Sequence, residues 1–415
     1  MTTRVIVIGG GASGLMAAGK AAESGAETLL LEKMNRPGRK LSITGKGRCN
    51  LTNVSEIPEF IEHFGKSGRF LRQAFHRFFT PDLMAFFETL GLPLTVERGR
   101  RVFPASGKAT DVVRVLLRWT RRMGVKIKPD SPVSALIIKS GRVTGVVSGD
   151  TIISADAVIL ATGGASYPAT GSTGDGYAMA ESAGHRIVPI RPALVPLTTS
   201  GNDAGKMAGL TLRNVRVRMF FNGKKKLKAF GEMGFIPDGI TGPVILTLSG
   251  AAVDALNRGE KVTLSIDLKP ALDDAKLDAR LRRDLAARSG EPLKSLLRGL
   301  IPREMVPVCI DHLHLSPAKI GSQITADERK RLRLWLKDYR LEVTGYHPLS
   351  EALITAGGVD TQEIDPKTMA SRLIRGLYMT GELLDIQADT GGYNLQAAFS
   401  TGWLAGQSAA TGEAD

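Results

Sequence analysis

The residues with the clearest chemistry lie near the N-terminus. Gly9, Gly11 and Gly14 are spaced as GxGxxG, and Glu32 follows them. Glycines at this spacing permit a tight turn and a close approach of the backbone to a pyrophosphate, whose charge is stabilised by the N-terminus of the following helix. A carboxylate after the next strand can accept hydrogen bonds from a ribose. The pattern predicts a dinucleotide-binding site; the alternative is an incidental glycine-rich turn.

Three later segments combine glycine with polar or charged residues. The first, PGRKLSITGKGRCNLTN over 37–53, is basic and lacks periodicity, so we expect an irregular loop. The second is VILATGGASYP, in which a buried strand ends in small residues that let the chain pass close to a ligand, although it could be an ordinary turn. The third is LYMTGELLDIQADTGGYNLQAAFSTG, where Gly391-Gly392 precede a helix near Tyr393. That helix N-terminus suits an electron-rich ring carbonyl.

The elements that must position these residues alternate between strand and helix. Residues 4–8 are typical of a strand, an Ala-rich helix runs to about Ser24, and 28–31 form the next strand. The periodicity then predicts amphipathic helices over 69–79, 81–90 and 111–123, a β-meander over 126–147 and a buried strand over 157–161. This alternation is typical of an α/β fold with a parallel sheet.

The alternation of strands and helices with glycine-rich loops ends after Pro196 and resumes near Ala356. Short alternating segments such as 215–221 and 262–268 indicate β-structure, whereas 272–336 is helical and charged. We therefore expect a discontinuous nucleotide-binding domain over 1–195 and 346–415, an inserted β-rich domain over 196–270 and 337–345, and a helical subdomain over 271–336.

Composition and charge narrow the class of protein. The chain has 415 residues, of which 43% are hydrophobic and 23% charged, as in a soluble protein of more than one domain. Two cysteines cannot form a disulfide framework, no cleavable signal precedes the first strand, and no apolar run approaches the roughly 20 residues of a membrane span. We expect a cytoplasmic protein without a membrane role.

The positive charge is concentrated in one region. The net charge is +14, and residues 201–340 contain 26 Lys or Arg against 16 Asp or Glu, so most of the excess lies there. Such an excess attracts polyanions, above all nucleic acid, although many enzymes carry a solvated positive face.

The motifs together resemble those of FAD-binding proteins of the glutathione-reductase superfamily. More narrowly, the chain resembles the YhiN-like or BaiN-like bacterial flavoproteins along essentially its whole length. The segments that carry the resemblance are GRKLSITGKGRCNLTN, ATGG with GSTGDGYAMAESAGH, ITGP, TAGGV and GGYNLQAAFSTG. The resemblance implies a discontinuous Rossmann-like FAD-binding domain with an inserted domain.

The resemblance also implies the residues that contact FAD, although some of the basic ones could be merely solvated. They are Gly9, Gly11, Ala12, Ser13, Gly14, Glu32, Lys33, Arg39, Lys40, Lys46, Gly47, Arg48, Cys49, Asn50, Val133, Thr162, Gly163, Gly164, Gly381, Glu382, Gly392, Tyr393, Asn394 and Leu395. No second GxGxxG is present for a nicotinamide, so NADH or NADPH would visit the flavin transiently, and the sequence does not distinguish the two.

Three residues are candidates for the proton donor of a flavin reaction. They are Cys49, His347 and Tyr393; for Cys49 the alternative is a small buried cysteine packed near the cofactor. Cys309, His312 and His314 have a spacing that could suggest a metal, but no second ligand cluster accompanies them and their apolar neighbours indicate packing. We expect no metal site.

The family implies three substrates: an rRNA uridine reduced to dihydrouridine, a conjugated oxo-steroid of the bile-acid type, and a small amine such as aminoacetone that is oxidised. The first two share one chemistry, because both reduce a double bond conjugated to a carbonyl and need a general acid. The positive charge of the insertion favours the RNA substrate, although few aromatic residues there could stack on a base.

The RNA contacts would come from two basic clusters. Lys224, Lys225, Lys226 and Lys228 follow the turn Phe221-Asn222-Gly223 and are expected on an exposed hairpin. Arg329, Lys330, Arg331 and Arg333 are expected on a helix. The alternative for the hairpin is a solvated surface without a partner.

Overall fold

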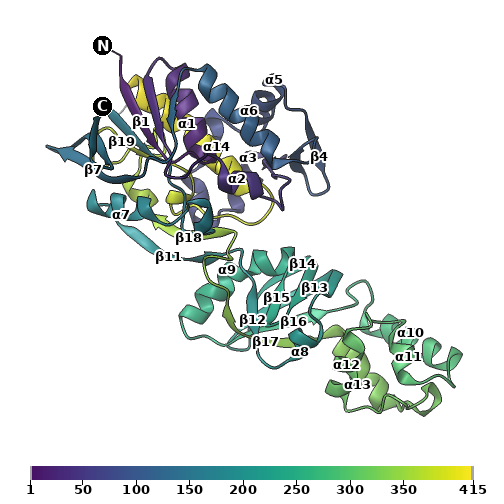
Figure 1. Ribbon diagram of the computed structural model, residues 1–415. Coiled ribbons are helices and arrows are strands. Elements are labelled where there is room, and N and C mark those ends of the chain that lie inside the picture. The colour runs from purple at the N-terminus through teal and green to yellow at the C-terminus, as the bar shows by residue number, and fades with distance from the viewer. Residues whose placement is uncertain (1, 413–415) are drawn as a thin grey trace. The chain divides into compact units, whose positions relative to one another are not determined.

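The computed structural model describes residues 2–412, which form two compact units. Unit 1 contains the chain up to Ala193 and again from Leu349 onward, and unit 2 contains Leu194–Pro348 (Figure 1). The expected fold class, a discontinuous α/β domain with an inserted β-rich region and helices, is confirmed. Within 2–412 no helix combines the length and apolar character that a bilayer crossing requires.

Unit 1 is built on a five-stranded parallel sheet. Its strand order is β19 (Leu377–Met379), β10 (Ala157–Leu160), β1 (Arg4–Ile8), β2 (Glu27–Leu31) and β6 (Lys126–Lys128). The strands β1 and β10 are almost wholly apolar because helices cover both faces of a parallel sheet. The expected meander over 126–147 is therefore wrong at its start, because residues 126–128 pair with β2 instead.

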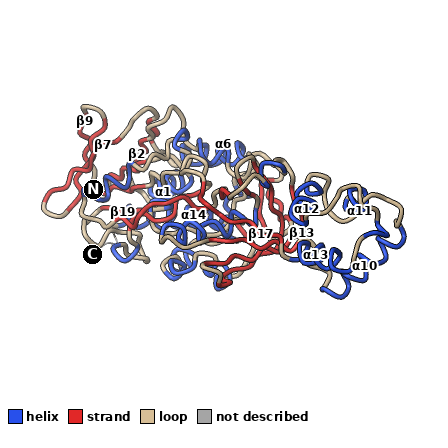
Figure 2. The backbone as a smooth tube through the Cα atoms, turned by 90° about the horizontal axis from the view of Figure 1, so that it is seen from below, coloured by secondary structure: helices blue, strands red, loops and turns tan. Residues whose placement is uncertain are grey.

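Helices α1 (Ala12–Glu23) and α14 (Tyr393–Thr411) lie side by side although they come from opposite ends of the chain (Figures 1 and 2). Small residues allow this contact: a Cβ atom added to Gly402 would lie 2.4 Å from the Ser13 carbonyl oxygen, and one added to Gly406 would lie 2.3 Å from that of Ala17. The close packing fixes the start of α14 relative to the glycine-rich turn before α1.

The remaining elements of unit 1 surround the sheet. They are α2 (Arg39–Ile43), β3 (Thr52–Asn53), α3 (Ile57–Glu62), α4 (Arg72–Arg77), α5 (Thr80–Thr89), β4 (Leu94–Glu97), β5 (Arg101–Pro104), α6 (Ala109–Arg122), β7 (Val133–Lys139), β8 (Arg142–Ser148), β9 (Thr151–Ser154), α7 (Asp175–Ser182), β11 (Ile187–Ala193) and β18 (Ile354–Val359).

Two expectations for this part of the chain are corrected. The segment 37–53 is not wholly irregular, because it contains α2 and β3, which are too short to give a periodic pattern. The helix expected over 69–79 is shorter, since residues 65–69 form a 3₁₀ turn and Phe78 has an extended backbone that ends α4.

Unit 2 contains a closed barrel of six strands. Their order is β12 (Leu197–Thr199), β15 (Gly239–Thr241), β14 (Lys224–Ile236), β13 (Thr211–Phe221), β16 (Val262–Asp267) and β17 (Tyr339–Tyr346). Along β13 interior side chains alternate with outward ones, as the period of two requires, whereas five of the six residues of β16 are buried. Helices α8 (Asp203–Lys206) and α9 (Pro243–Asn257) accompany the barrel.

The helical segment of unit 2 forms one end of this unit (Figure 2). It comprises α10 (Asp274–Ala287), α11 (Leu293–Leu297), α12 (Met305–Leu313) and α13 (Ala326–Lys337). Its buried leucines, together with Trp335, share one hydrophobic core with the barrel strands. The helices are therefore fixed to the barrel through packed apolar side chains.

Candidate cofactor site

The expected cofactor residues of unit 1 gather at one edge of the parallel sheet. Because all five strands run in the same direction, their carboxyl ends lie along one edge. Strand β1 is followed there by Gly9, β2 by Glu32, β10 by the Thr162 segment and β19 by the Gly381 segment. A ligand at this edge would meet all four segments.

The turn between β1 and α1 has the geometry of a phosphate-binding loop. Gly9 has a φ of +102°, and its N–H donates to the Leu31 carbonyl at 2.8 Å, so the turn is tied to β2. A Cβ atom added to Gly14 would lie only 1.8 Å from the Gly9 carbonyl oxygen, whereas one added to Gly11 would meet nothing within 4 Å. Open space therefore lies at the N-terminus of α1, whose first N–H groups have no partner within the helix.

Glu32 is a buried carboxylate held by backbone groups. The N–H groups of Gly10 and Met34 donate to its two oxygens, each at 2.8 Å. Each carboxylate oxygen keeps a further lone pair, which can accept a ribose hydroxyl. The Ser131 N–H donates to the Glu32 carbonyl at 2.9 Å, so the start of β7, with Val133, lies near the same edge.

Lys40 and Glu382 are brought together although they lie 342 positions apart along the chain. Lys40 Nζ donates to Glu382 Oε2 at 2.8 Å and to Ser166 Oγ at 2.6 Å. Glu382 Oε1 accepts from Ser166 and from the Thr355 N–H at 2.7 Å. This network joins the loops after β10 and β19 to the basic segment at α2.

The two most specific motifs also meet. Asn53, three residues after the GKGRCN segment, donates from Nδ2 to the Gly391 carbonyl at 3.2 Å. Asn394 accepts from the Ala388 N–H at 2.9 Å and donates back to the Ala388 carbonyl at 3.0 Å. The loop before α14 is thus fixed on one side by β3 and on the other by the first turn of α14.

Several buried oxygens at this edge have no hydrogen-bond partner within residues 2–412. They are Asn50 Oδ1, Thr162 Oγ1, Thr380 Oγ1 and Gln387 Oε1. A buried polar atom without a partner is costly, so these positions favour a polar ligand beside them. Together with the open space at Gly11, they fit the isoalloxazine and pyrophosphate groups of FAD.

Four expected FAD contacts are turned to other partners or to solvent. Lys33 pairs with Asp175 at 2.6 Å, and Arg48 pairs with Glu97. Arg39 donates to the Ala169 carbonyl at 3.2 Å, and Lys46 is exposed. Nearby carboxylates and carbonyls thus bind at least three of these basic residues, and their contacts with FAD stay a prediction.

Asp175 shows the strength of one of these pairs. Burial alone would raise the pKa of Asp175, but the hydrogen bonds from Lys33 and Thr173 lower it below its ordinary value. The Asp175 carboxylate therefore stays ionised at neutral pH, and its contact with Lys33 ties the start of α7 to the segment after β2.

The three candidate proton donors have different surroundings. Cys49 is fully buried, and burial raises its pKa to about 12, so its thiol stays neutral and the packing alternative is favoured. Tyr393, the first residue of α14, is buried, which raises its pKa above its ordinary value. His347 belongs to unit 2, where its Nε2 lies 3.1 Å from Asp238 Oδ2.

Sequence reasoning missed several residues around Tyr393 and Glu382. The His63 ring stacks on Tyr393 with centroids 3.8 Å apart, and His63 Nδ1 lies 3.1 Å from Asp389 Oδ2. Ser166 and Thr355 complete the Lys40–Glu382 network. Ser166 lies in the motif ATGGAS and Thr355 in TAGGV, but only the glycines of these motifs were interpreted, and the two hydroxyl groups were not considered.

The residues considered for a metal have other partners. His312 Nε2 lies 2.7 Å from Asp203 Oδ2, and Trp335 Nε1 donates to His312 Nδ1 at 3.3 Å. Cys309 is buried in the core of unit 2. The contacts of His312 connect α8 to α12 and α13.

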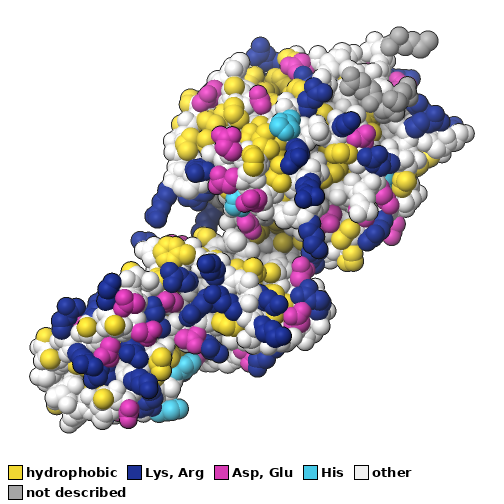
Figure 3. Space-filling model, turned by 180° about the vertical axis from the view of Figure 1, so that it is seen from behind, with side chains coloured by type: hydrophobic (Ala, Val, Ile, Leu, Met, Phe, Trp, Pro, Cys, Tyr) yellow, Lys and Arg dark blue, Asp and Glu magenta, His cyan; other side chains and the backbone are white. Residues whose placement is uncertain are grey.

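The lysine hairpin of unit 2 is exposed. Lys224, Lys225, Lys226 and Lys228 begin β14 after the Asn222-Gly223 turn, and all four are exposed. Among the described residues, no carboxylate lies within ion-pair distance of these lysines. Figure 3 shows Lys and Arg side chains spread over the visible face of this unit, at lower left, with acidic side chains between them.

The second expected cluster, on α13, is partly neutralised. Arg329 pairs with Asp278 at 3.0 Å and Arg333 with Asp274 at 3.4 Å, so only Lys330 and Arg331 remain exposed. The four basic residues lie on one helix, as expected, and α10 supplies the two carboxylates that neutralise part of their charge.

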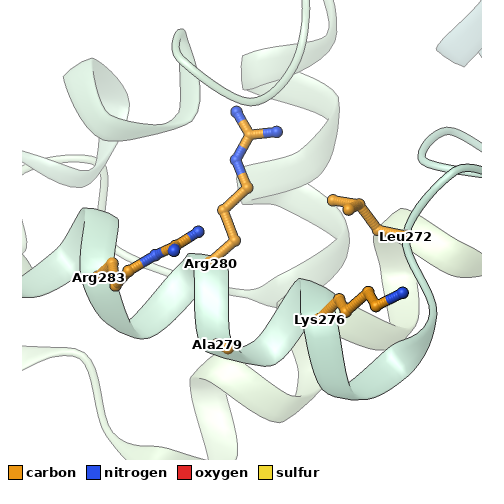
Figure 4. Close-up of a pocket in the computed structure, with 5 residues that line it drawn as sticks. All are labelled: Leu272, Lys276, Ala279, Arg280 and Arg283. Atoms are coloured by element: carbon orange, nitrogen blue, oxygen red, sulfur yellow. The ribbon is translucent and has the colours of Figure 1, made fainter.

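Three further cations of the helical segment lie on α10. A pocket of about 540 Å³ is lined by Lys276, Arg280 and Arg283 with Leu272 and Ala279, and no carboxylate lines it (Figure 4). Burial and the nearby charge of Arg280 lower the pKa of Lys269. Lys276 lies 3.7 Å from Asp273 and Arg280 lies 3.5 Å from Asp284, so these carboxylates offset part of the positive charge around the pocket.

Comparison with known proteins gives one family and two kinds of relative. Residues 3–408 match the family described as HI0933-like protein Rossmann domain. The chain is 34% identical over 409 residues to the 3-dehydro-bile acid delta(4,6)-reductase of Clostridium scindens, covering 98% of this chain and 99% of that one. It is 28% identical over 402 residues to the ribosomal RNA dihydrouridine synthase of Escherichia coli, covering 97% and 96%. The resemblance indicated by the motifs is confirmed.

Two solved structures share the fold. One is the open conformation of a flavocytochrome c3 fumarate reductase, with a TM-score of 0.54 and 19% identity, covering 100% of this chain and 79% of that one. The other is 3-ketosteroid delta1-dehydrogenase from Sterolibacterium denitrificans, with a TM-score of 0.53 and 15% identity, covering 99% and 100%. At these identities the likeness extends to the fold alone.

Proposed function

The chain belongs to the HI0933-like family and is an FAD-dependent oxidoreductase, and from this premise we propose that it uses NADH or NADPH to reduce a carbon–carbon double bond conjugated to a carbonyl. The favoured substrate is a uridine of ribosomal RNA, which becomes dihydrouridine. In uracil the ring carbonyl activates the double bond, as the ketone does in an enone.

The residues of unit 1 would hold the cofactor in defined roles. The N-terminus of α1 beside Gly11 would receive the pyrophosphate, and Glu32 would accept the ribose hydroxyls. The unpartnered oxygens of Asn50, Thr162 and Thr380 would receive the remaining polar groups. Bound there, FAD supplies the redox chemistry of the reaction.

The chain itself must supply a proton to the α-carbon of the reduced double bond. Tyr393 and His347 are the candidates, because each carries an exchangeable proton and has a carboxylate nearby that can orient the group. For His347 this is Asp238 at 3.1 Å, and for Tyr393 it is Asp389, which acts through the stacked His63 ring. The buried neutral thiol of Cys49 is the weaker candidate.

One observation carries the choice of RNA, namely the hairpin of four exposed lysines that no carboxylate of the described residues neutralises. Phosphate groups bind such cations through release of counterions. The pocket on α10 would offer a second place for a phosphate. A small sterol needs neither feature.

The second candidate function is reduction of an oxo-steroid enone. It is favoured by the higher identity, 34% against 28%, to the bile-acid reductase than to the dihydrouridine synthase. Both functions need the same proton donor and differ only in what surrounds the double bond.

Dihydrouridine mapping in ribosomal RNA separates the two functions. RNA from a strain that lacks the gene is compared with parental RNA and with RNA from a strain complemented by the wild-type chain. We expect one site to lose dihydrouridine in the deletion strain and to regain it on complementation. An unchanged map, together with turnover of a 3-oxo-4,6-diene steroid by the purified protein, would refute the RNA function in favour of the enone reductase.

A further inference from the structure

An aromatic side chain lies exposed on the barrel of unit 2. Phe230 on β14 is 59% exposed, and it is the only aromatic residue among the exposed large hydrophobic side chains of the described chain. A phenylalanine in the middle of a strand often packs into a core, since burial removes its large apolar surface from water. Its exposure therefore requires an explanation.

The neighbours of Phe230 on the same face are cations. In the antiparallel pair β13–β14, Phe230 is opposite Arg216, Arg218 is opposite Lys228, and Phe220 is opposite Lys225. Residues opposite each other in such a pair point to the same side of the sheet. We call this set of six residues, Arg216, Arg218, Phe220, Lys225, Lys228 and Phe230, the cationic strand face.

The cations nearest Phe230 are not neutralised. No carboxylate of residues 2–412 lies within ion-pair distance of Arg216 or Lys228. The acidic residues at the margins have other partners: Glu232 lies 3.8 Å from Arg213, Asp267 pairs with Lys337, and Asp338 lies 3.9 Å from Arg218 and 2.9 Å from Arg340. Phe230 is thus an apolar ring with one such cation opposite it on β13 and another two residues away on β14.

We propose that Phe230 is a stacking platform for an unpaired RNA base, and that Arg216 and Lys228 bind the phosphates on either side of that base. The proposal rests on the proposed function for the identity of the nucleic acid. It names where the substrate RNA contacts unit 2, next to the lysine hairpin on the same strand pair.

The chemistry of the cationic strand face matches that of single-stranded nucleic acid. Proteins that bind unpaired strands combine a positive groove along the backbone with aromatic rings on which bases stack, often on the strands of a barrel. Every base offers a π-face, so a ring without hydrogen-bonding groups, such as that of phenylalanine, is sufficient. A uridine to be reduced must be unpaired to reach a flavin, so unpaired neighbours are available for stacking.

The test uses the holoenzyme with a 23S rRNA transcript made in vitro and with a twelve-nucleotide oligo(U). The variants are Phe230→Ala, Phe230→Leu and Phe230→Trp, and the control is Leu334→Ala, which removes an apolar side chain of 49% exposure from α13 of the same unit. Binding is measured across salt concentrations, and FAD content and dihydrouridine formation are measured in parallel.

We expect Phe230→Ala and Phe230→Leu to weaken binding to oligo(U) by about 5- to 150-fold, since one base stack contributes that much. Phe230→Trp and the Leu334 control should bind as the parent does. Because stacking releases no counterions, the salt dependence of the Phe230 variants should run parallel to that of the parent. FAD content should be unchanged in all of them.

Different failures identify different errors. Equal binding by the Leu and Trp variants, or a changed salt slope, would overturn stacking. A parent that is dimeric, with a monomeric Phe230→Ala variant, would show that a second copy covers the ring and would also overturn it. If the parent binds oligo(U) through Phe230 but forms no dihydrouridine in any rRNA, the proposed function fails while the platform stands.

Discussion

Removing the charge of the lysine hairpin tests whether RNA phosphates contact unit 2. The perturbation replaces Lys224, Lys225, Lys226 and Lys228 together by Gln, which removes four positive charges without adding negative ones. All four side chains are exposed and pair with no carboxylate of the described residues, so the fold should lose little stability.

The expected magnitude follows from counterion release. Each phosphate contact contributes about −0.7 to the slope of log K against log salt for a single strand and about −0.9 for a duplex. Four lost contacts should therefore make the slope shallower by about 2.8 to 3.6. Between 50 and 200 mM salt, the parent should lose about 50- to 150-fold more affinity than the variant.

The assay is binding of an rRNA transcript across that salt range, with the proportion of bound FAD and the rate of nicotinamide oxidation measured on the same samples. A matched control replaces Arg121, Arg122, Lys139 and Arg142 of unit 1 by Gln, since these are equally exposed. Equal slopes for the parent and the hairpin variant would refute the reasoning, as would an equal change of slope in the control. The stronger variant, with Glu at the four hairpin positions, should abolish dihydrouridine formation.

Three further predictions concern the cofactor and the thiols. Glu32→Ala should lower the ratio of bound flavin to protein, while Glu32→Gln, which keeps an acceptor oxygen, should lower it less; a full complement of FMN in the parent would contradict the dinucleotide site. Reduced nicotinamide should bleach the flavin anaerobically and oxygen turnover should then be slow, whereas rapid peroxide formation from aminoacetone without nicotinamide would indicate an amine oxidase. Burial raises the pKa values of Cys49 and Cys309 to about 12, whereas the unfolded thiols ionise near 9. The unfolded state therefore loses these protons first as the pH rises. The free energy of unfolding should fall between those two values by about 1.4 kcal/mol per pH unit for each thiol. Chemical denaturation at pH 8 to 10.5 checks this, and the Cys49→Ala variant should show a smaller slope.

The elements at the edge of the parallel sheet could be predicted from the sequence because local chemistry determines them. The turn at Gly9 and Gly14 needs glycine for steric reasons, and a strand such as β10 is recognisable by its unbroken apolar run. Each of these patterns is contained in a few consecutive residues, so it can be recognised without knowledge of the tertiary structure. The short elements α2 and β3 escaped prediction because five and two residues give no period.

The ion-pair partners of the long basic side chains could not be predicted from the sequence. Lys33, Arg48 and Arg329 each pair with a carboxylate far away in the sequence, namely Asp175, Glu97 and Asp278. Such pairings depend on which elements pack together, and no local pattern encodes them. The same holds for Phe230, whose strand was expected but whose exposure depends on the direction in which the barrel closes.

The energetics of the two units differ in a way that bears on substrate choice. In unit 1 the polar groups at the sheet edge are buried, and Lys40, Glu382 and Ser166 satisfy one another, so a change in any of them leaves a costly unpaired group. The four hairpin lysines and Arg216 in unit 2 are exposed and pair with no carboxylate of the described residues, so they can be replaced at little cost in stability. Under the proposed function, related enzymes can therefore keep one reaction and exchange its substrate by changing exposed residues of unit 2.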